Sequence, residues 1–300
     1  MITLRQLEFA LAVAKFKHFK RAAEECNISQ SALSLGIAEL EKQLDTQIFE
    51  RNNKQVLITP IGADILERAT RIFAEVNDLI TRAQSHQTPL AYPMTIGIIP
   101  TIAPFLLPKV LPALKAEFPN FQLTVIEEQT ERLLEKVRYG LIDSAIIALP
   151  YATDGLLTFE FWAEAFLAVF APDDPHASLK KITTEQLLES NLMLLGEGHC
   201  LTDQALSVCH LDKRQVKHGF SDASLHTLIQ MSLNGMGTTL VPQIAANQIR
   251  QQDPKVALVP LNEAAPHRKL AFVTRLNYAR VDDVNLLGHV FADALQQAVS

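Results

Sequence analysis

The sequence holds few cysteines, no long hydrophobic run and no excess of positive charge. Only 3 of its 300 residues are cysteine. Apolar segments such as 94–99 and 144–149 suit buried strands and are far too short to span a membrane. The N-terminus opens into a helical pattern with mixed charges and does not resemble a signal peptide. These absences predict a cytoplasmic protein with no membrane contact, in which thiols are reduced and any disulfide is transient.

The formal net charge of −6 disfavours a protein that binds nucleic acid along its whole length. The charge is unevenly distributed, because residues 1–90 hold 11 basic and 11 acidic side chains. All of the net negative charge therefore belongs to the rest of the chain. This asymmetry permits a nucleic-acid contact at the N-terminal end.

Three apolar stripes at helical spacing predict three helices within residues 4–44. Between the second and third helices lies a corner of four residues, 27–30, in which Asn27 can take a left-handed C-cap and Ser29 can act as an N-cap. Segments 48–51 and 56–59 then predict a two-stranded wing. Together these signals predict a winged helix-turn-helix domain over residues 1–59.

A single long helix is expected over residues 60–88. Its apolar positions alternate at spacings of four and three, which is the seam of a coiled coil and predicts a dimerisation helix. The seam consists of Ile65, Ala69, Ile72, Val76, Leu79 and Ala83. The same seam could instead pack on the regulatory lobes of its own chain. Residues 89–93 begin and end with proline and are predicted to form a hinge.

From residue 94 onward, short apolar strands alternate with amphipathic helices, which predicts an α/β regulatory domain with mostly parallel sheets. Its length suggests two lobes, one of about 94–163 with 268–300 and one of about 164–267. Ligand sites in such a domain lie at strand ends and between lobes. Strands are expected at 94–99, 121–127, 143–149, 166–171, 192–195, 237–241, 256–260 and 270–275. Helices are expected at 104–118, 130–139, 184–189, 201–209, 224–234 and 281–299.

Two of the three cysteines, Cys200 and Cys209, lie in one short segment. The residues between them have helical spacing, so their Cα atoms should be roughly 13 Å apart. A disulfide needs Cα atoms within about 7 Å. The pair could bond only if this helix unwound, which suits a redox switch better than a structural bridge. Cys26, by contrast, completes an apolar helix stripe and is expected to be plain core.

The N-terminal motifs resemble the winged helix-turn-helix head of LysR-type transcriptional regulators. The matching segments are 4–9, 19–23, 29–34, 40–41 and 49–51. The resemblance implies base and phosphate contacts from the start of the third helix and backbone contacts from basic residues around it. The candidates are Ser29, Gln30, Ser31, Ser34, Lys20, Arg21, Arg51 and Lys54. Gly36 and Glu39 depart from the common pattern, since glycine weakens a helix and glutamate repels phosphate.

Segments 98–108, 128–130, 194–205 and 235–242, together with Cys209, resemble the hydrogen-peroxide-sensing OxyR subfamily of that family. The resemblance makes Cys200 the peroxidatic thiol and Cys209 the resolving thiol. His199 and the hydroxyls of Thr101 and Thr130 are then candidates to bind peroxide and to stabilise the leaving hydroxide. Thr202 stands where that subfamily commonly carries arginine, so one source of thiolate stabilisation is missing there.

The resemblance further implies an activator of antioxidant genes that binds double-stranded promoter DNA and hydrogen peroxide. Such a protein would form a homotetramer, a dimer of dimers, contact RNA polymerase, need no cofactor and not be an enzyme. A zinc site at the two His-Cys pairs is disfavoured, because a helix separates the pairs. Three alternatives remain: a LysR-type regulator with a small-metabolite effector between its lobes, a thiol peroxidase and a solute-binding protein.

Overall fold

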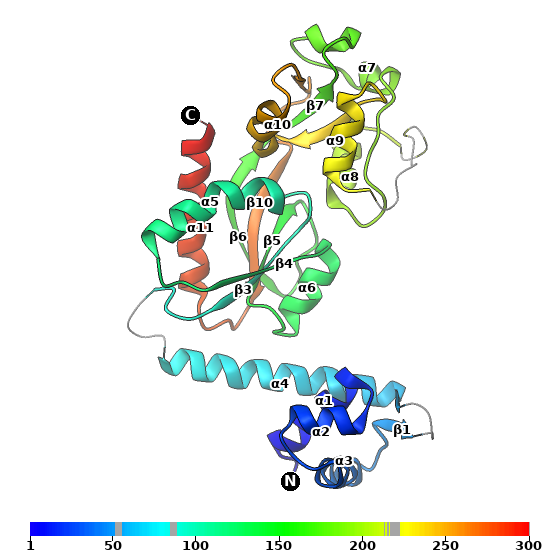
Figure 1. The fold of residues 1–300 in the computed structure, drawn as a ribbon, viewed down its shortest axis with the longest axis vertical. Helices are drawn as coiled ribbons and strands as arrows, with labels where there is room; N and C mark the ends of the chain where they lie inside the picture. The colour runs from blue at the N-terminus through cyan, green and yellow to red at the C-terminus, as the bar shows by residue number, and fades with distance from the viewer. Residues whose placement is uncertain (52–55, 85–88, 213, 215, 217–222, 300) are drawn as a thin grey trace. The chain divides into compact units, whose positions relative to one another are not determined.

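A computed structural model describes residues 1–51, 56–84, 89–212, 214, 216 and 223–299 of the protein. The chain divides into an N-terminal unit that contains residues 1–84 and a C-terminal unit that contains most of the remainder (Figure 1). Within the described residues, no helix combines the length and the apolar character that a membrane span requires.

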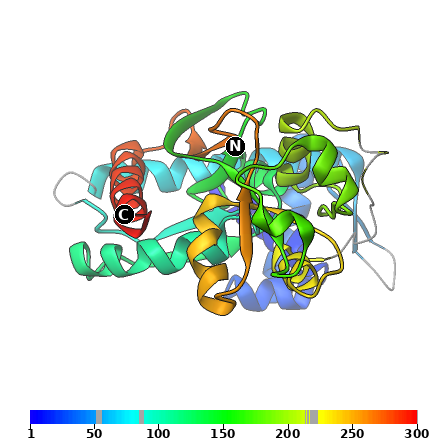
Figure 2. The ribbon, with the colours of Figure 1, turned by 90° about the horizontal axis from the view of Figure 1, so that it is seen from above.

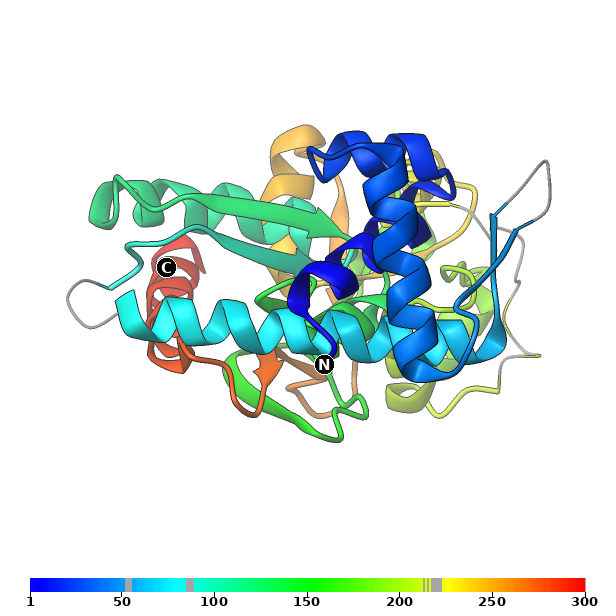
Figure 3. The ribbon, with the colours of Figure 1, turned by 90° about the horizontal axis from the view of Figure 1, so that it is seen from below.

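The N-terminal unit is a three-helix head with a small hairpin and one long helix. Helix α1 packs on α2, α3 and the long helix α4 (Figure 3). Strands β1 and β2 pair antiparallel, with Phe49 opposite Ile58, as the predicted wing requires. The elements are α1 Leu4–Phe16, α2 Phe19–Glu25, α3 Gln30–Leu44, β1 Phe49–Arg51, β2 Val56–Ile58 and α4 Pro60–Gln84.

The corner between α2 and α3 has the left-handed residue and the helix cap that its sequence predicts. Asn27 adopts the left-handed conformation with φ of 54°. The Ser29 side chain accepts a hydrogen bond from the backbone amide of Ala32 and caps α3. Cys26 is buried in the apolar core of the head, which confirms the expectation for this cysteine.

Gly36 has a packing role that its helix propensity does not reveal. A Cβ atom at this position would lie 2.6 Å from the Phe9 ring of α1. Glycine therefore lets α1 and α3 approach closely, although it disfavours the helix by about 1 kcal/mol relative to alanine.

In the C-terminal unit, a five-stranded sheet has the strand order β4-β3-β5-β10-β6. Helices α5 and α11 pack together on one face (Figures 1 and 2), and α6 contacts β5 and β10. The strands are β3 Met94–Ile98, β4 Leu123–Glu127, β5 Ser144–Leu149, β6 Leu156–Glu164 and β10 Arg268–Arg275. The helices are α5 Ala103–Glu117, α6 Thr130–Arg138 and α11 Val281–Val299.

A second sheet, β8-β7-β9, carries the intervening helices. Its strands are β7 Phe166–Phe170, β8 Thr239–Pro242 and β9 Ala257–Pro260. Around them lie η1 Pro175–Ser178, α7 Thr184–Glu189, α8 Cys200–Val208, α9 Leu225–Leu233, η3 Gln243–Ala245 and α10 Ala246–Gln252.

The expectation of mostly parallel sheets is wrong. Among the strands that the structure describes, β3 pairs parallel with β4 and β5, whereas β10 pairs antiparallel with β5 and β6, and β7 pairs antiparallel with β8 and β9. The expected strand at 192–195 is only a bridge between Leu192 and Thr238, and β6 and α10 were not expected. A pattern of apolar residues identifies a strand, but it does not show whether the neighbouring strand runs parallel or antiparallel to it.

Candidate functional site

The candidate site lies at the carboxyl ends of the parallel strands. Ile98 at the end of β3 pairs with Glu127 at the end of β4. Thr101 and Thr130 each follow three residues beyond these positions, so both leave the sheet at the same edge. Both side chains are buried, and their hydroxyls have no hydrogen-bond partner of ordinary geometry among the described residues. This edge is where α/β sheets usually bind ligands.

Helix α8 begins at Cys200, and two of its side chains fix its position. Gln204 donates from Nε2 to the carbonyl oxygen of Ala148, near the end of β5, at 3.0 Å. Thr202 donates from Oγ1 to the carbonyl oxygen of Leu195 at 3.0 Å. Thr202 thus holds the first turn of the helix in place.

Burial and three neighbouring groups set the acidity of Cys200. Burial has the largest effect and raises the pKa of this thiol above its ordinary value. The positive charge of Arg268 and the hydroxyl of Thr130 act in the opposite direction, while Asp203 adds to the rise. The thiol is therefore protonated at rest, beside two groups that stabilise the thiolate once it forms.

Arg268 is the functional candidate that the sequence argument missed. Its side chain is fully buried and donates from Nε to Glu164 Oε1 at 2.8 Å, with Nη2 2.7 Å from the same oxygen. This cation, which acts to lower the pKa of Cys200, comes from β10, far along the chain. The available signal was a basic residue at the start of a strand whose centre is apolar, but sequence spacing cannot link it to Cys200.

His199 occupies the N-cap position of α8 but makes no capping hydrogen bond with its side chain. It is half-buried, and burial lowers the pKa of its imidazole below the ordinary value. The ring is therefore neutral at neutral pH. An uncharged imidazole can act as a hydrogen-bond donor or as an acceptor.

Cys209 lies at the opposite end of α8 in a different environment. Its side chain is fully buried. Burial, followed by the nearby Glu263 carboxylate, raises the pKa of Cys209 to about 12. The Thr184 hydroxyl contacts both the carbonyl oxygen of Cys209, at 3.0 Å, and Glu263 Oε1, at 3.1 Å.

Both cysteines are free thiols, and the nine-residue helix α8 stands between them. At 1.5 Å per residue, their Cα atoms are about 13 Å apart, almost twice the reach of a disulfide. The observed state is therefore the reduced one.

The candidate DNA contacts lie on the surface of the head. Lys20, Arg21, Gln30 and Ser31 are exposed, and Ser34 is half-buried. Ser29 is exposed as well, although its hydroxyl already caps α3. The Arg51 side chain and all of Lys54 lie outside the described residues.

A winged helix-turn-helix head combined with a two-lobed α/β unit and a buried thiol site defines a DNA-binding regulator with a sensory domain. The profile described as "Bacterial regulatory helix-turn-helix protein, lysR family" matches residues 4–63, and "LysR substrate binding domain" matches residues 87–296. The chain belongs to the LysR family of transcriptional regulators.

Similar proteins include both peroxide regulators and others. The HTH-type transcriptional regulator EstR of Acinetobacter baylyi is 37% identical, with 91% of this chain and 90% of EstR covered. A probable hydrogen peroxide-inducible genes activator of Mycobacterium avium is 36% identical, with 98% and 94% covered. Among solved structures, a cysteine-to-aspartate variant of full-length OxyR from Pseudomonas aeruginosa has a TM-score of 0.78 and 31% identity, with 99% and 95% covered.

Proposed function

We propose that this chain is a hydrogen-peroxide-responsive transcriptional regulator that activates antioxidant genes, with Cys200 as the reacting thiol. The observation that carries the proposal is the position of Cys200 at the first turn of α8, beside Arg268 and Thr130. A buried thiol with a cation and a hydroxyl that both act to lower its pKa suits attack on a small, neutral oxidant. The similarity to peroxide-inducible activators and to OxyR supports the same function.

The first chemical step uses the thiolate of Cys200. Its sulfur attacks one peroxide oxygen, the O–O bond breaks, and the departing hydroxide takes up a proton to become water. Buried donors that face the leaving oxygen stabilise its developing charge. Thr130, Thr101 and His199 are the donors that we assign to this step. The product is a sulfenic acid on Cys200.

The second step joins Cys200 to Cys209. The Cys209 sulfur attacks the sulfenic sulfur, an S–S bond forms and water leaves. Because α8 separates the two thiols, this step requires α8 to unwind. Unwinding would break the hydrogen bonds from Gln204 to Ala148 and from Thr184 to Cys209, and so would change the surface around α8.

The direct test exchanges Cys200 for serine and follows target transcription after a peroxide pulse. We expect the response to disappear, whereas Cys26→Ser, a matched exchange in the head, should retain it. An undiminished response in the Cys200 variant would contradict the proposal. Mass spectrometry of the oxidised wild type should find the Cys200–Cys209 bridge, and a bridge through Cys26 would overturn the assignment of Cys209.

We further propose that the head reads double-stranded promoter DNA in the cytoplasm, as one of four heads in a dimer of dimers that contacts RNA polymerase. Exposed apolar side chains on α4 support pairing through this helix, since Ile72 and Leu79 are 43% and 70% exposed. Leu79→Glu should lower the oligomeric state in sedimentation analysis.

Gln30→Ala should weaken specific DNA binding more than Lys20→Ala does. Lys20→Ala should mainly reduce the salt dependence of DNA binding.

We propose that the thiols react stoichiometrically with peroxide and serve as a sensor, and that the protein does not turn peroxide over as a peroxidase does. Sustained peroxide consumption with a thiol reductant would contradict this. A regulator that responds to a small metabolite between its lobes is the second candidate, and the match of residues 87–296 to the profile "LysR substrate binding domain" favours it. Peroxide titration of the purified protein separates the two, because only the first proposal requires loss of both regulatory-domain thiols.

A further inference from the structure

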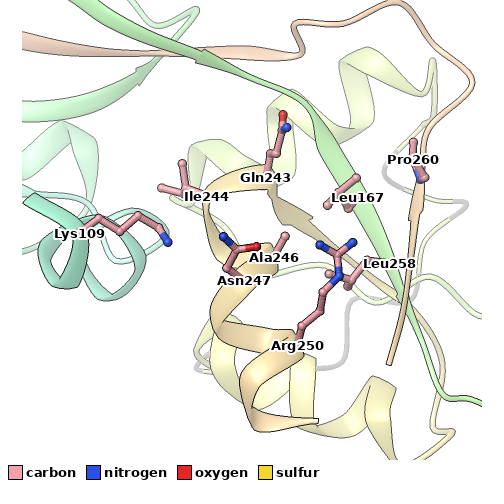
Figure 4. Close-up of a pocket in the computed structure, with 9 residues that line it drawn as sticks. All are labelled: Lys109, Leu167, Gln243, Ile244, Ala246, Asn247, Arg250, Leu258 and Pro260. Atoms are coloured by element: carbon pink, nitrogen blue, oxygen red, sulfur yellow. The ribbon is translucent and has the colours of Figure 1, made fainter. Parts of the chain in front are cut away.

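A cavity lies in the C-terminal unit, lined by α5, β7, η3, α10 and β9 (Figure 4). Its volume is about 300 Å³, at the lower end of the range for small-molecule sites. Neither Cys200 nor Thr101 nor Thr130 lines it. The cavity is therefore distinct from the thiol site and is not used by the proposed peroxide chemistry.

Two cationic side chains enter this cavity from different elements. Lys109 extends from α5 toward Asn247, and Arg250 extends from α10 toward Leu167 and Leu258 (Figure 4). Neither cation forms an ion pair within the described part of the chain. Burial lowers the pKa of Lys109, which indicates that its charge is partly desolvated. Two like charges that face one cavity repel each other, so an anion between them would be favoured.

The rest of the lining fits an organic anion better than a simple inorganic one. Leu167 and Leu258 form an apolar wall, while the amides of Gln243 and Asn247 add polar groups. Sites with an apolar body and a few placed polar groups are typical of small organic ligands. Because the two cations reach the cavity from opposite sides of Asn247, a ligand with a charge at each end matches them (Figure 4).

The wall of the cavity is also held in place before any ligand binds. The backbone amide of Ile244 donates to Glu164 Oε2 at 2.9 Å, and the backbone amide of Gln243 donates to the carbonyl oxygen of Ala165 at 2.9 Å. Glu164 is itself fixed by the buried Arg268. A preformed wall reduces the ordering cost of binding.

We propose that this cavity binds a small organic dicarboxylate, with one carboxylate at Lys109, the other at Arg250, and its hydrocarbon portion against Leu167 and Leu258. The site would give the protein a second input, a small acidic molecule, besides the redox state of its thiols. The binding step itself does not depend on the proposed peroxide chemistry.

The test is isothermal titration of the reduced full-length protein with succinate, glutarate, butyrate and sulfate. We expect succinate or glutarate to bind at least about 10-fold more tightly than butyrate, because loss of one charged hydrogen bond costs that much affinity. Sulfate should bind more weakly than either dicarboxylate. No detectable binding of the dicarboxylates, or sulfate or butyrate binding as tightly, would overturn the proposal.

Charge-removing variants then locate the site. Lys109→Met and Arg250→Met should each weaken dicarboxylate binding at least about 10-fold, toward the affinity of butyrate. Lys115→Met, on the exposed side of the same helix α5, and Lys255→Met, after α10, are matched controls and should bind like the wild type. Equal affinity in all four variants would refute this location. Cys200→Ser should bind like the wild type, so loss of peroxide sensing and loss of this site are distinguishable.

Discussion

Replacement of Thr130 by valine tests the thiol site most sharply. Valine has nearly the same volume as threonine but no hydroxyl. Thr130 is buried, and its hydroxyl has no partner of ordinary geometry within the described residues, yet it lowers the pKa of Cys200. The exchange therefore removes an interaction with the thiolate and leaves no other group without a partner.

The size of the effect follows from the hydrogen bond that is lost. A hydrogen bond to a charged group contributes about 1.5–3 kcal/mol, so loss of the Thr130 hydroxyl should raise the pKa of Cys200. The thiolate fraction at neutral pH would fall about 10- to 100-fold. Because a more basic thiolate is also more nucleophilic, the rate of reaction with peroxide should fall only about 3- to 15-fold. Loss of a donor to the leaving hydroxide would slow the reaction further.

The assay is the second-order rate constant for peroxide as a function of pH, with a urea unfolding curve for each variant. Thr130→Val should slow the reaction, move its pH profile to higher pH and leave stability unchanged or higher. Thr202→Val is the matched control on α8, because its hydroxyl bonds to Leu195 rather than to the thiol. It should lose about 1 kcal/mol of stability with an unchanged pH profile. A Thr130 variant with wild-type rate and profile would refute the proposed role of this hydroxyl.

Three further predictions concern stability. Because folding raises the pKa of Cys209 from its ordinary value near 9 to about 12, the stability from the neutral buried thiol is complete below pH 9 and is lost from there to pH 12. Cys209→Ser should therefore flatten the alkaline stability curve by about 1.4 kcal/mol per pH unit relative to wild type, and identical slopes would contradict this. Glu263→Gln removes a charge that raises this pKa and should reduce the alkaline loss, as measured by the same unfolding series. Ser29→Ala removes the cap of α3 and should cost about 1 kcal/mol in urea unfolding, whereas Ser31→Ala, which leaves the cap bond intact, should cost less.

Local signals identified most of the elements correctly. The head formed as expected because its caps, its left-handed corner at Asn27 and its apolar stripes act over a few residues. The helix between the cysteines was expected at 201–209 and is observed one residue earlier at both ends, as Cys200–Val208. Sheet direction was the main error, since strand pairing joins residues that are far apart in the sequence.

For the site, the sequence by itself determined the reactive residue types and the constraint between them. Two thiols nine positions apart on a helix cannot bond without unwinding it, whatever the rest of the fold does. Only the tertiary structure decided the electrostatics of those thiols. It buried Cys200 at a strand edge beside Thr130, brought Arg268 to it from β10, and set Glu263 beside Cys209. A pKa depends on burial and on charges within a few ångströms, and the burial of both thiols and the positions of Arg268 and Glu263 come from long-range packing.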